Sequence, residues 1–211
     1  SWLILPFFTL TLFLIVASYH FGKEDSVFGN FNKFKLSSLF LFLKGSLVIL
    51  APLYFHAYET IKIFEILDVK FNQYNSTLIV ILISLSLISN FFIDKNIILS
   101  LIDSLTIIVL NMNFEPLLAF TVYFCFLHSI RHSLSLIENM SNKNFKKGLI
   151  NFLKKALPLT IVTALGFLIA VFLLNKYFLI NTAILKVIFI GLASLTFPHI
   201  LLEYLLEKYE K

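Results

Sequence analysis

The fold class follows from residues 156–175, which read ALPLTIVTALGFLIAVFLLN and contain no charged side chain. A membrane-spanning helix needs about 20 consecutive apolar residues, so this stretch predicts one span. Residues 2–19 and 77–93 are also free of charged side chains. Four further apolar segments cover residues 34–56, 96–110, 116–134 and 177–202. The pattern predicts an all-α, polytopic integral membrane helix bundle with about seven transmembrane helices.

The composition supports the membrane class. Of the 211 residues, 59% are apolar and 14% are charged, whereas a soluble domain has roughly 45–50% and 25%. A soluble surface cannot cover this excess of apolar side chains, which excludes a disordered protein, a secreted disulfide scaffold and an ordinary cytosolic enzyme. The net charge of +5 is typical of loops that set membrane orientation, and no nucleic-acid partner is expected.

Basic residues predict the orientation of the chain. Residues 131–155 contain six of the 17 Lys and Arg residues and one acid, Glu138. The positive-inside rule places such a stretch in the cytoplasm. Residues 57–70 then lie outside, either in the plane of the interface or as an extension of the second span. Abundant Ile, Phe, Asn and Lys with little Ala are typical of an AT-rich bacterial genome, so we expect a bacterial inner (cytoplasmic) membrane protein.

One transmembrane domain over residues 1–211 is expected, since the sequence contains no internal repeat and no low-complexity linker. The chain opens with Ser1 and Trp2 directly at an apolar segment, without Met or a flanking loop. This start suggests that an N-terminal helix is missing.

All five histidines lie inside apolar segments or within a residue of their ends. They are His20, His56, His128, His132 and His199. An ionisable group at membrane depth is costly and is a functional candidate by default. A helix-end histidine bonded to a carbonyl group is the ordinary explanation for one such residue, but it explains five of them poorly.

His128 and His132 form the most specific pattern. They are four residues apart, so they share one face of a helix, and this spacing lets two imidazoles bind one metal ion. Arg131, between them, is expected to anchor the cytoplasmic end of its span. Without the glutamate of an H-E-x-x-H motif, the pair does not indicate a zinc protease.

Carboxylates lie near the other three histidines: Asp25 near His20, Glu59 near His56 and Glu203 near His199. A metal-bound histidine usually donates its second ring N–H to such an acceptor, so these acids are predicted to support ligands. Interfacial ion pairing explains Glu59 and Glu203 equally well. We expect Gly22 to break the first helix, which lets Asp25 turn back toward His20.

The predicted topology groups four histidines toward the cytoplasmic half of the bundle: His20, His128, His132 and His199. Neutral imidazoles suit Fe, Zn, Cu and Ni, so we expect one metal site there. His56 falls at the opposite end of its span unless Pro52 bends the chain back. Asp103, in residues 96–110, is either a functional acid or the sign of a shallow helix.

Aromatic side chains accompany these histidines: Tyr123, Phe124, Phe126 and Phe197. They are candidates for the wall of an apolar tunnel. Phe contributes 25 residues to the chain, however, so ordinary core packing explains them better. The sequence has no Gly-rich phosphate loop, CxxC pair or G-x-S-x-G motif.

Four motifs follow one another in the chain: Tyr19-His20-Phe21-Gly22-x-x-Asp25, Pro52-x-x-x-His56, Phe124-x-x-x-His128-Ser129-x-Arg131-His132 and Phe197-Pro198-His199-x-x-Leu202. Together they resemble the Brp/Blh family of membrane β-carotene 15,15′-dioxygenases, from about residue 19 to residue 202. Each motif alone is weak, but the ordered set is fairly specific.

The resemblance implies an all-helical membrane oxidoreductase that uses O₂ and non-haem Fe(II) to split β-carotene at its central double bond into two all-trans-retinal molecules. It implies His20, His128 and His132 as iron ligands, with His199 and then His56 as further candidates. The family has an earlier motif that contains a His and an Asp, and this chain has none before His20. We therefore expect either an additional N-terminal helix or a different histidine that completes the site.

Two other functions stay open from the residues alone. Two histidines on facing helices are the ligands of a b-type haem protein in the membrane. A transporter with a His/Asp relay would use the histidines together with Asp103. Bound non-haem iron distinguishes the dioxygenase from both alternatives.

Overall fold

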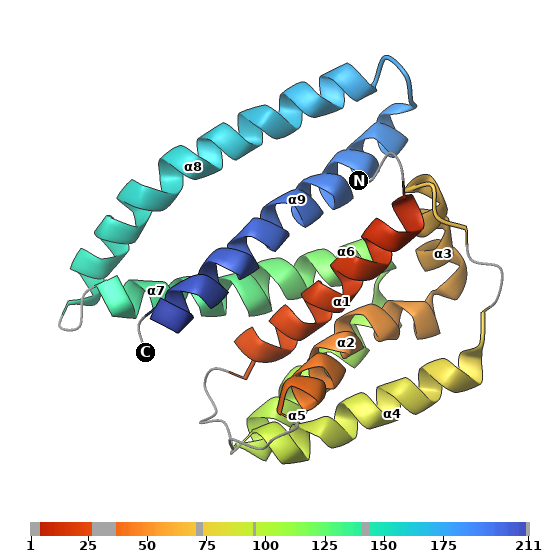
Figure 1. Cartoon of the computed structure of the whole chain (residues 1–211), viewed down its shortest axis with the longest axis horizontal. Coiled ribbons are helices and arrows are strands. Elements are labelled where there is room, and N and C mark those ends of the chain that lie inside the picture. Colours follow the sequence, from red (N-terminus) through yellow and green to blue (C-terminus); the bar gives the residue numbers. More distant parts are fainter. Residues whose placement is uncertain (1–4, 27–36, 71–73, 95, 141–143, 210–211) are drawn as a thin grey trace. The chain divides into compact units, whose positions relative to one another are not determined.

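The computed structural model describes residues 5–26, 37–70, 74–94, 96–140 and 144–209. These ranges contain helices and no strand, which confirms the all-α class (Figure 1). In chain order the helices are α1 (Pro6–Glu24), α2 (Ser37–Phe55), α3 (Ala57–Ile66), α4 (Ser76–Ile93), α5 (Ile97–Asn113), α6 (Pro116–Val122), the π-helix η1 (Tyr123–Ser129), α7 (Ile130–Met140), α8 (Phe145–Leu174) and α9 (Ile180–Tyr209).

The helices fall into two compact units. The first unit contains residues 1–124 and 196–211, and the second unit contains residues 125–195. One boundary between them lies within η1 and the other lies within α9. The expected single transmembrane domain over residues 1–211 stays a prediction.

Helix α2 is the centre of the first unit. It packs against α1, α3, α4, α5 and α6, and Figure 1 shows it between α1 and α4. Leu47 and Ala51 of α2 are fully buried in this core, together with Leu10 of α1. The other helices of this unit are therefore positioned largely by their contacts with α2.

Two glycines bring the backbones of α1 and α2 together. A Cβ atom at Gly22 would overlap the carbonyl oxygen of Leu41, and a Cβ atom at Gly45 would overlap the carbonyl oxygen of Ser18. Small residues at such crossings let helices approach closely in lipid, where the hydrophobic effect does not drive association. The prediction that Gly22 breaks the first helix is wrong, because α1 passes through this crossing and continues to Glu24.

Asparagine and proline fix the starts of several helices. Asparagine side chains accept the backbone N–H three residues later at Asn75 (3.2 Å), Asn96 (3.3 Å) and Asn144 (3.2 Å), before α4, α5 and α8. Each bond satisfies one N–H that has no partner within the helix. Pro6 and Pro116 stand in the first turns of α1 and α6, where proline has no helical hydrogen bond to lose.

The described residues contain five helical stretches long and apolar enough to cross a membrane, one of which runs through α6, η1 and α7. These stretches are Ser37–Phe55, Ser76–Ile93, Pro116–Glu138, Phe145–Leu174 and Ile180–Leu201. Helix α5 is apolar but shorter, with 17 residues, and the last turns of α1 contain the polar residues His20, Lys23 and Glu24. The predicted number of seven spans is therefore not confirmed.

Two of the predicted connections are largely helical, and for the first of them only the alternative of an interfacial segment stays open. Residues 57–70 do not extend α2, because the chain bends at His56 and the separate helix α3 begins at Ala57. Most of residues 131–155 is helical, since α7 runs to Met140 and α8 begins at Phe145. Lys and Glu are good helix formers, so a change from apolar to charged composition does not end a helix. The cytoplasmic location of this stretch stays a prediction.

Candidate active site

His20 lies near the C-terminal end of α1 and is buried, with 6% of its surface exposed. Its ring contacts the ring of His199, which α9 carries: the ring centroids are 5.8 Å apart and the rings are nearly perpendicular, at 88°. Both residues belong to the first unit. Two of the four predicted metal ligands thus lie side by side, and nitrogen atoms of adjacent imidazoles are a donor pair that suits iron.

Asp25 ends α1 as its C-cap residue. One of its carboxylate oxygens, Oδ2, accepts a 2.6 Å hydrogen bond from the hydroxyl of Tyr123. Tyr123 is itself buried and is the first residue of η1. The predicted supporting role of Asp25 toward His20 stays a prediction, whereas its bond to Tyr123 was not expected from the sequence.

Aromatic rings pack around Phe21, the residue after His20. The ring of Phe21 meets the rings of Phe120 (6.4 Å), Tyr123 (5.7 Å) and Phe124 (6.4 Å) edge-on. Phe120 and Phe124 stack on each other at 5.7 Å. These offset and edge-to-face arrangements are the favourable ones for aromatic pairs. The cluster gives the end of α1 a packed, apolar neighbourhood.

His128 and His132 belong to the second unit. His128 is buried in η1, and His132 is half-buried in α7. The prediction assumed one regular α-helix through both residues, but a π-helix with wider turns ends at Ser129, between them. π-helical segments are often found at functional sites. Within the described residues, no group of three or more His, Cys, Asp or Glu side chains is placed to hold a metal ion.

His56 is placed differently from the other candidates. It lies at the bend between α2 and α3, and its Nε2 is 2.9 Å from the backbone oxygen of Asn111. A carbonyl oxygen only accepts, so Nε2 carries the proton and donates it. Glu59 is exposed on α3. The side chain of Glu203, on α9, lies outside the described part of the structure.

The remaining sequence candidates have varied environments. Asp103 is half-buried on α5. Tyr123 and Phe124 take part in the aromatic cluster around Phe21, as core packing predicts. Phe126 is 66% exposed, and the side chain of Phe197 is not among those described.

The structure contains a buried ion pair whose two residues were not among the site residues predicted from the sequence. Lys44, on α2, donates to the Asp94 carboxylate at 2.7 Å, and both side chains are buried. Lys44 also donates to the hydroxyl of Ser26 at 2.8 Å, just beyond α1. The hydroxyl of Ser100, on α5, donates to the same carboxylate oxygen at 2.5 Å. Lys44, in the middle of the apolar run 34–56 and away from Lys35 at its start, is the signal that identifies this network, because a charge at membrane depth needs a partner.

Comparison with known proteins gives two matches. A family model described as beta-carotene 15,15′-dioxygenase matches residues 1–207. The chain is also 30% identical over 215 residues to the beta-carotene 15,15′-dioxygenase of uncultured marine bacterium 66A03. That alignment covers 95% of this chain and 73% of the relative. No solved structure shows significant similarity to the chain.

Proposed function

Because the chain belongs to the β-carotene 15,15′-dioxygenase family, we propose that it splits β-carotene at its central double bond with O₂. The central C=C bond breaks, and each of its two carbons takes one oxygen atom, so that two all-trans-retinal molecules form. No other reductant or oxidant is required. The apolar helices indicate a membrane protein, and we place the enzyme in the bacterial inner membrane, where it meets a substrate dissolved in the bilayer.

The contact between His20 and His199 carries the proposal for the site. These residues come from helices at opposite ends of the chain, yet their rings lie 5.8 Å apart. Within the first unit they offer imidazole nitrogen atoms at one place. We propose that they are ligands of one iron(II) ion. The sequence alone predicts His128 and His132 as its further ligands. The bound iron would supply the activation of O₂.

The side chains near His20 fit an apolar substrate. A polyene has no hydrogen-bonding group, so only shape and apolar contact position it. Phe21 and its aromatic neighbours provide such contacts at the end of α1, next to the buried His20.

The experiment is expression in cells that make β-carotene, followed by extraction of retinal and measurement of iron in the purified protein. The wild-type chain should form retinal and contain about one iron per molecule. Replacement of His20, His128, His132 or His199 with Ala should remove iron and retinal together. Ser133→Ala, next to His132 on α7, is the matched control and should keep both.

Three results would contradict the proposal. Full iron content and near-normal retinal formation in His132→Ala would remove this residue from the site. A Soret absorption band in the purified wild-type protein would indicate a haem protein, and a protein without any bound metal would favour the transporter alternative.

A further inference from the structure

The second unit carries the positive charge of the chain. Its residues 125–195 contain eight Lys and Arg residues and one acid, Glu138. The rest of the chain contains nine basic and eleven acidic residues, so the net charge of +5 comes entirely from the second unit. No Asp or Glu occurs anywhere from residue 139 to residue 202. Such a one-sided charge distribution attracts anionic partners.

Four of these basic residues form one face at the start of α8. We call it the lysine face, and its members are all exposed: Lys146, Lys147, Lys154 and Lys155. At about 3.6 residues per turn, the four side chains leave α8 within one half of its circumference. Helix α7 packs against another part of α8, because a Cβ atom at Gly148 would overlap the carbonyl oxygen of Ile137. The lysine face therefore stays open.

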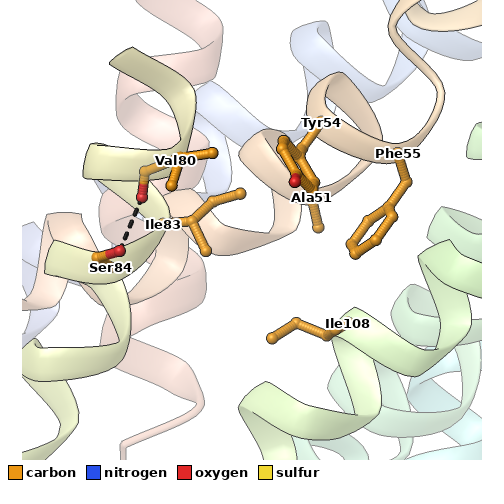
Figure 2. A pocket seen from close by; sticks show the side chains of 7 residues that line it. All are labelled: Ala51, Tyr54, Phe55, Val80, Ile83, Ser84 and Ile108. Atoms are coloured by element: carbon orange, nitrogen blue, oxygen red, sulfur yellow. Dashed lines mark hydrogen bonds between the residues drawn. The ribbon is translucent and has the colours of Figure 1, made fainter. Parts of the chain in front are cut away.

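The lysine face also lacks anionic partners within the protein. Among the described residues, no carboxylate forms an ion pair with any of its four members, whereas the buried Lys44 has Asp94 at 2.7 Å. The pocket of about 160 Å³ between α2, α4 and α5 has no charged side chain in its lining (Figure 2). An anion would therefore find its counter-charge on α8 and not in that pocket.

The length of α8 indicates the depth of the lysine face in a membrane. Helix α8 has 30 residues, roughly 45 Å, which matches the ~40–45 Å of a bilayer with its headgroup regions. Residues 156–174 contain no charge and are roughly 28 Å long, close to the ~30 Å hydrocarbon core. Lys154 and Lys155 thus directly precede the hydrocarbon core, and Lys146 and Lys147 lie about 12 Å further out along the helix. Lipid phosphate groups lie just outside the hydrocarbon core.

We propose that the lysine face binds the headgroups of anionic phospholipids. Each ammonium group donates charge-assisted hydrogen bonds to phosphate oxygens. A zwitterionic lipid carries the same phosphate with a cation attached, and that cation repels the lysines. Attraction of a basic segment beside a span to anionic lipid amounts to about fivefold in affinity for each lysine. The bound lipid would fix the depth of α8 in its leaflet.

The test measures lipid binding to the purified protein in detergent micelles. A micelle has no inside and outside, so a charge that serves only to orient the chain in a membrane has no effect there. The protein is titrated with phosphatidylglycerol and with phosphatidylcholine of identical acyl chains, and native mass spectrometry counts the bound lipid. Wild-type protein should prefer phosphatidylglycerol by more than about 30-fold. Lys154→Gln/Lys155→Gln should weaken phosphatidylglycerol binding about 10- to 30-fold and leave phosphatidylcholine binding unchanged.

Lys62→Gln/Lys70→Gln is the matched control. It also removes two exposed lysines, but from a segment that contains the acids Glu59, Glu65 and Asp68. It should bind phosphatidylglycerol as the wild-type protein does. Equal losses in the two double variants, or equal affinity of the wild-type protein for the two lipids, would overturn the lipid site.

Two further measurements need no variant. Raising the ammonium acetate concentration from about 0.1 M to about 1 M shortens the screening length from about 10 Å to about 3 Å and should release phosphatidylglycerol from the wild-type protein. Phosphatidylglycerol binding that does not respond to salt would contradict the proposal. Inorganic phosphate at millimolar concentration should not displace the lipid, and displacement would show a site for a soluble anion in place of a lipid site.

Discussion

The hydroxyl of Tyr123 donates a 2.6 Å hydrogen bond to the carboxylate of Asp25. Asp25 caps the helix that carries His20, and Tyr123 begins the π-helix that contains His128. The bond therefore joins the end of α1 to the start of η1, and each of these two helices contains a candidate metal ligand. A hydroxyl–carboxylate bond of this length is charge-assisted and stronger than a bond between neutral groups.

Tyr123→Phe should weaken iron binding or retinal formation by about 10- to 100-fold, the usual effect of losing a group that orients metal ligands. The buried ring stays in place, but the Asp25 carboxylate loses the hydrogen bond from this hydroxyl. Asp25→Asn should be milder, because the amide oxygen still accepts from Tyr123. Iron content and retinal yield measure both effects.

The control for this pair is Tyr74→Phe, which removes an exposed hydroxyl bonded to the Leu53 carbonyl at 3.1 Å. It should behave like the wild-type protein. If Tyr123→Phe matched Tyr74→Phe in iron content and retinal yield, the Asp25–Tyr123 bond would have no part in the site.

The sequence predicts the helical class of this fold but not the number of membrane spans. A long apolar run in lipid has few solutions besides a helix, because its backbone groups must bond internally. The ends of the helices are harder to predict from the sequence. Helix α8, for example, begins at Phe145 and includes four basic residues before the apolar stretch starts. The Gly22–Gly45 crossing requires knowledge of which helices meet, and a single sequence does not contain it.

The candidate site was predictable in part. The positions of His20 and His199 in apolar segments pointed to one place, and their rings are in contact. Nothing in residues 123–129 distinguishes a π-helix from an α-helix, so the winding between His128 and His132 was not foreseen. Lys44 was identifiable as a charge in the middle of an apolar run, but its partner Asp94 looked like part of an ordinary turn between two spans.

Removal of His56 should leave the iron content unchanged. Its Nε2 already donates to the Asn111 carbonyl at 2.9 Å, so it holds the bend between α2 and α3 against α5. His56→Gln keeps a donor group and should retain both folding and iron. His199→Ala should lower the iron content, and metal analysis of the two purified variants makes the comparison. A folded His56→Gln protein without iron would contradict this assignment, because His56 would then be the iron ligand in place of His199.

Alanine at either crossing glycine should destabilise the first unit. The new Cβ atom at Gly22 or Gly45 meets a backbone carbonyl that cannot rotate away, and overpacking of this kind costs about 1–3 kcal/mol. Gly166→Ala and Gly191→Ala are the matched controls, because a Cβ atom there has nothing within 4 Å. These two should be neutral or slightly stabilising, since alanine favours helix more than glycine does. Thermal unfolding in detergent measures all four, and equal behaviour of all four would exclude close packing at the crossing.

Lys146 should be accessible only from the cytoplasm, because residues 131–155 are rich in basic residues. Labelling of Lys146→Cys with a membrane-impermeant thiol reagent tests this orientation in intact cells and in inverted vesicles. The exposed Cys125 must first be replaced with Ser to remove background labelling. Reaction in intact cells would reverse the orientation and, with it, the cytoplasmic grouping of the histidines.

Replacing Lys44 or Asp94 alone should lower the stability of the protein far more than replacing both residues together. Lys44→Met leaves the Asp94 carboxylate buried without its cation, and Asp94→Leu leaves the Lys44 ammonium without its anion. Breaking one side of a buried pair typically costs about 3–5 kcal/mol, whereas apolar replacement of both partners is often neutral.

The double variant Lys44→Met/Asp94→Leu should therefore recover most of the thermal stability in detergent that either single variant loses. The hydroxyls of Ser26 and Ser100 bond to the pair and would lose a partner in the double variant, so recovery should be incomplete. Additive losses in the double-mutant cycle would show that the two charges are not coupled.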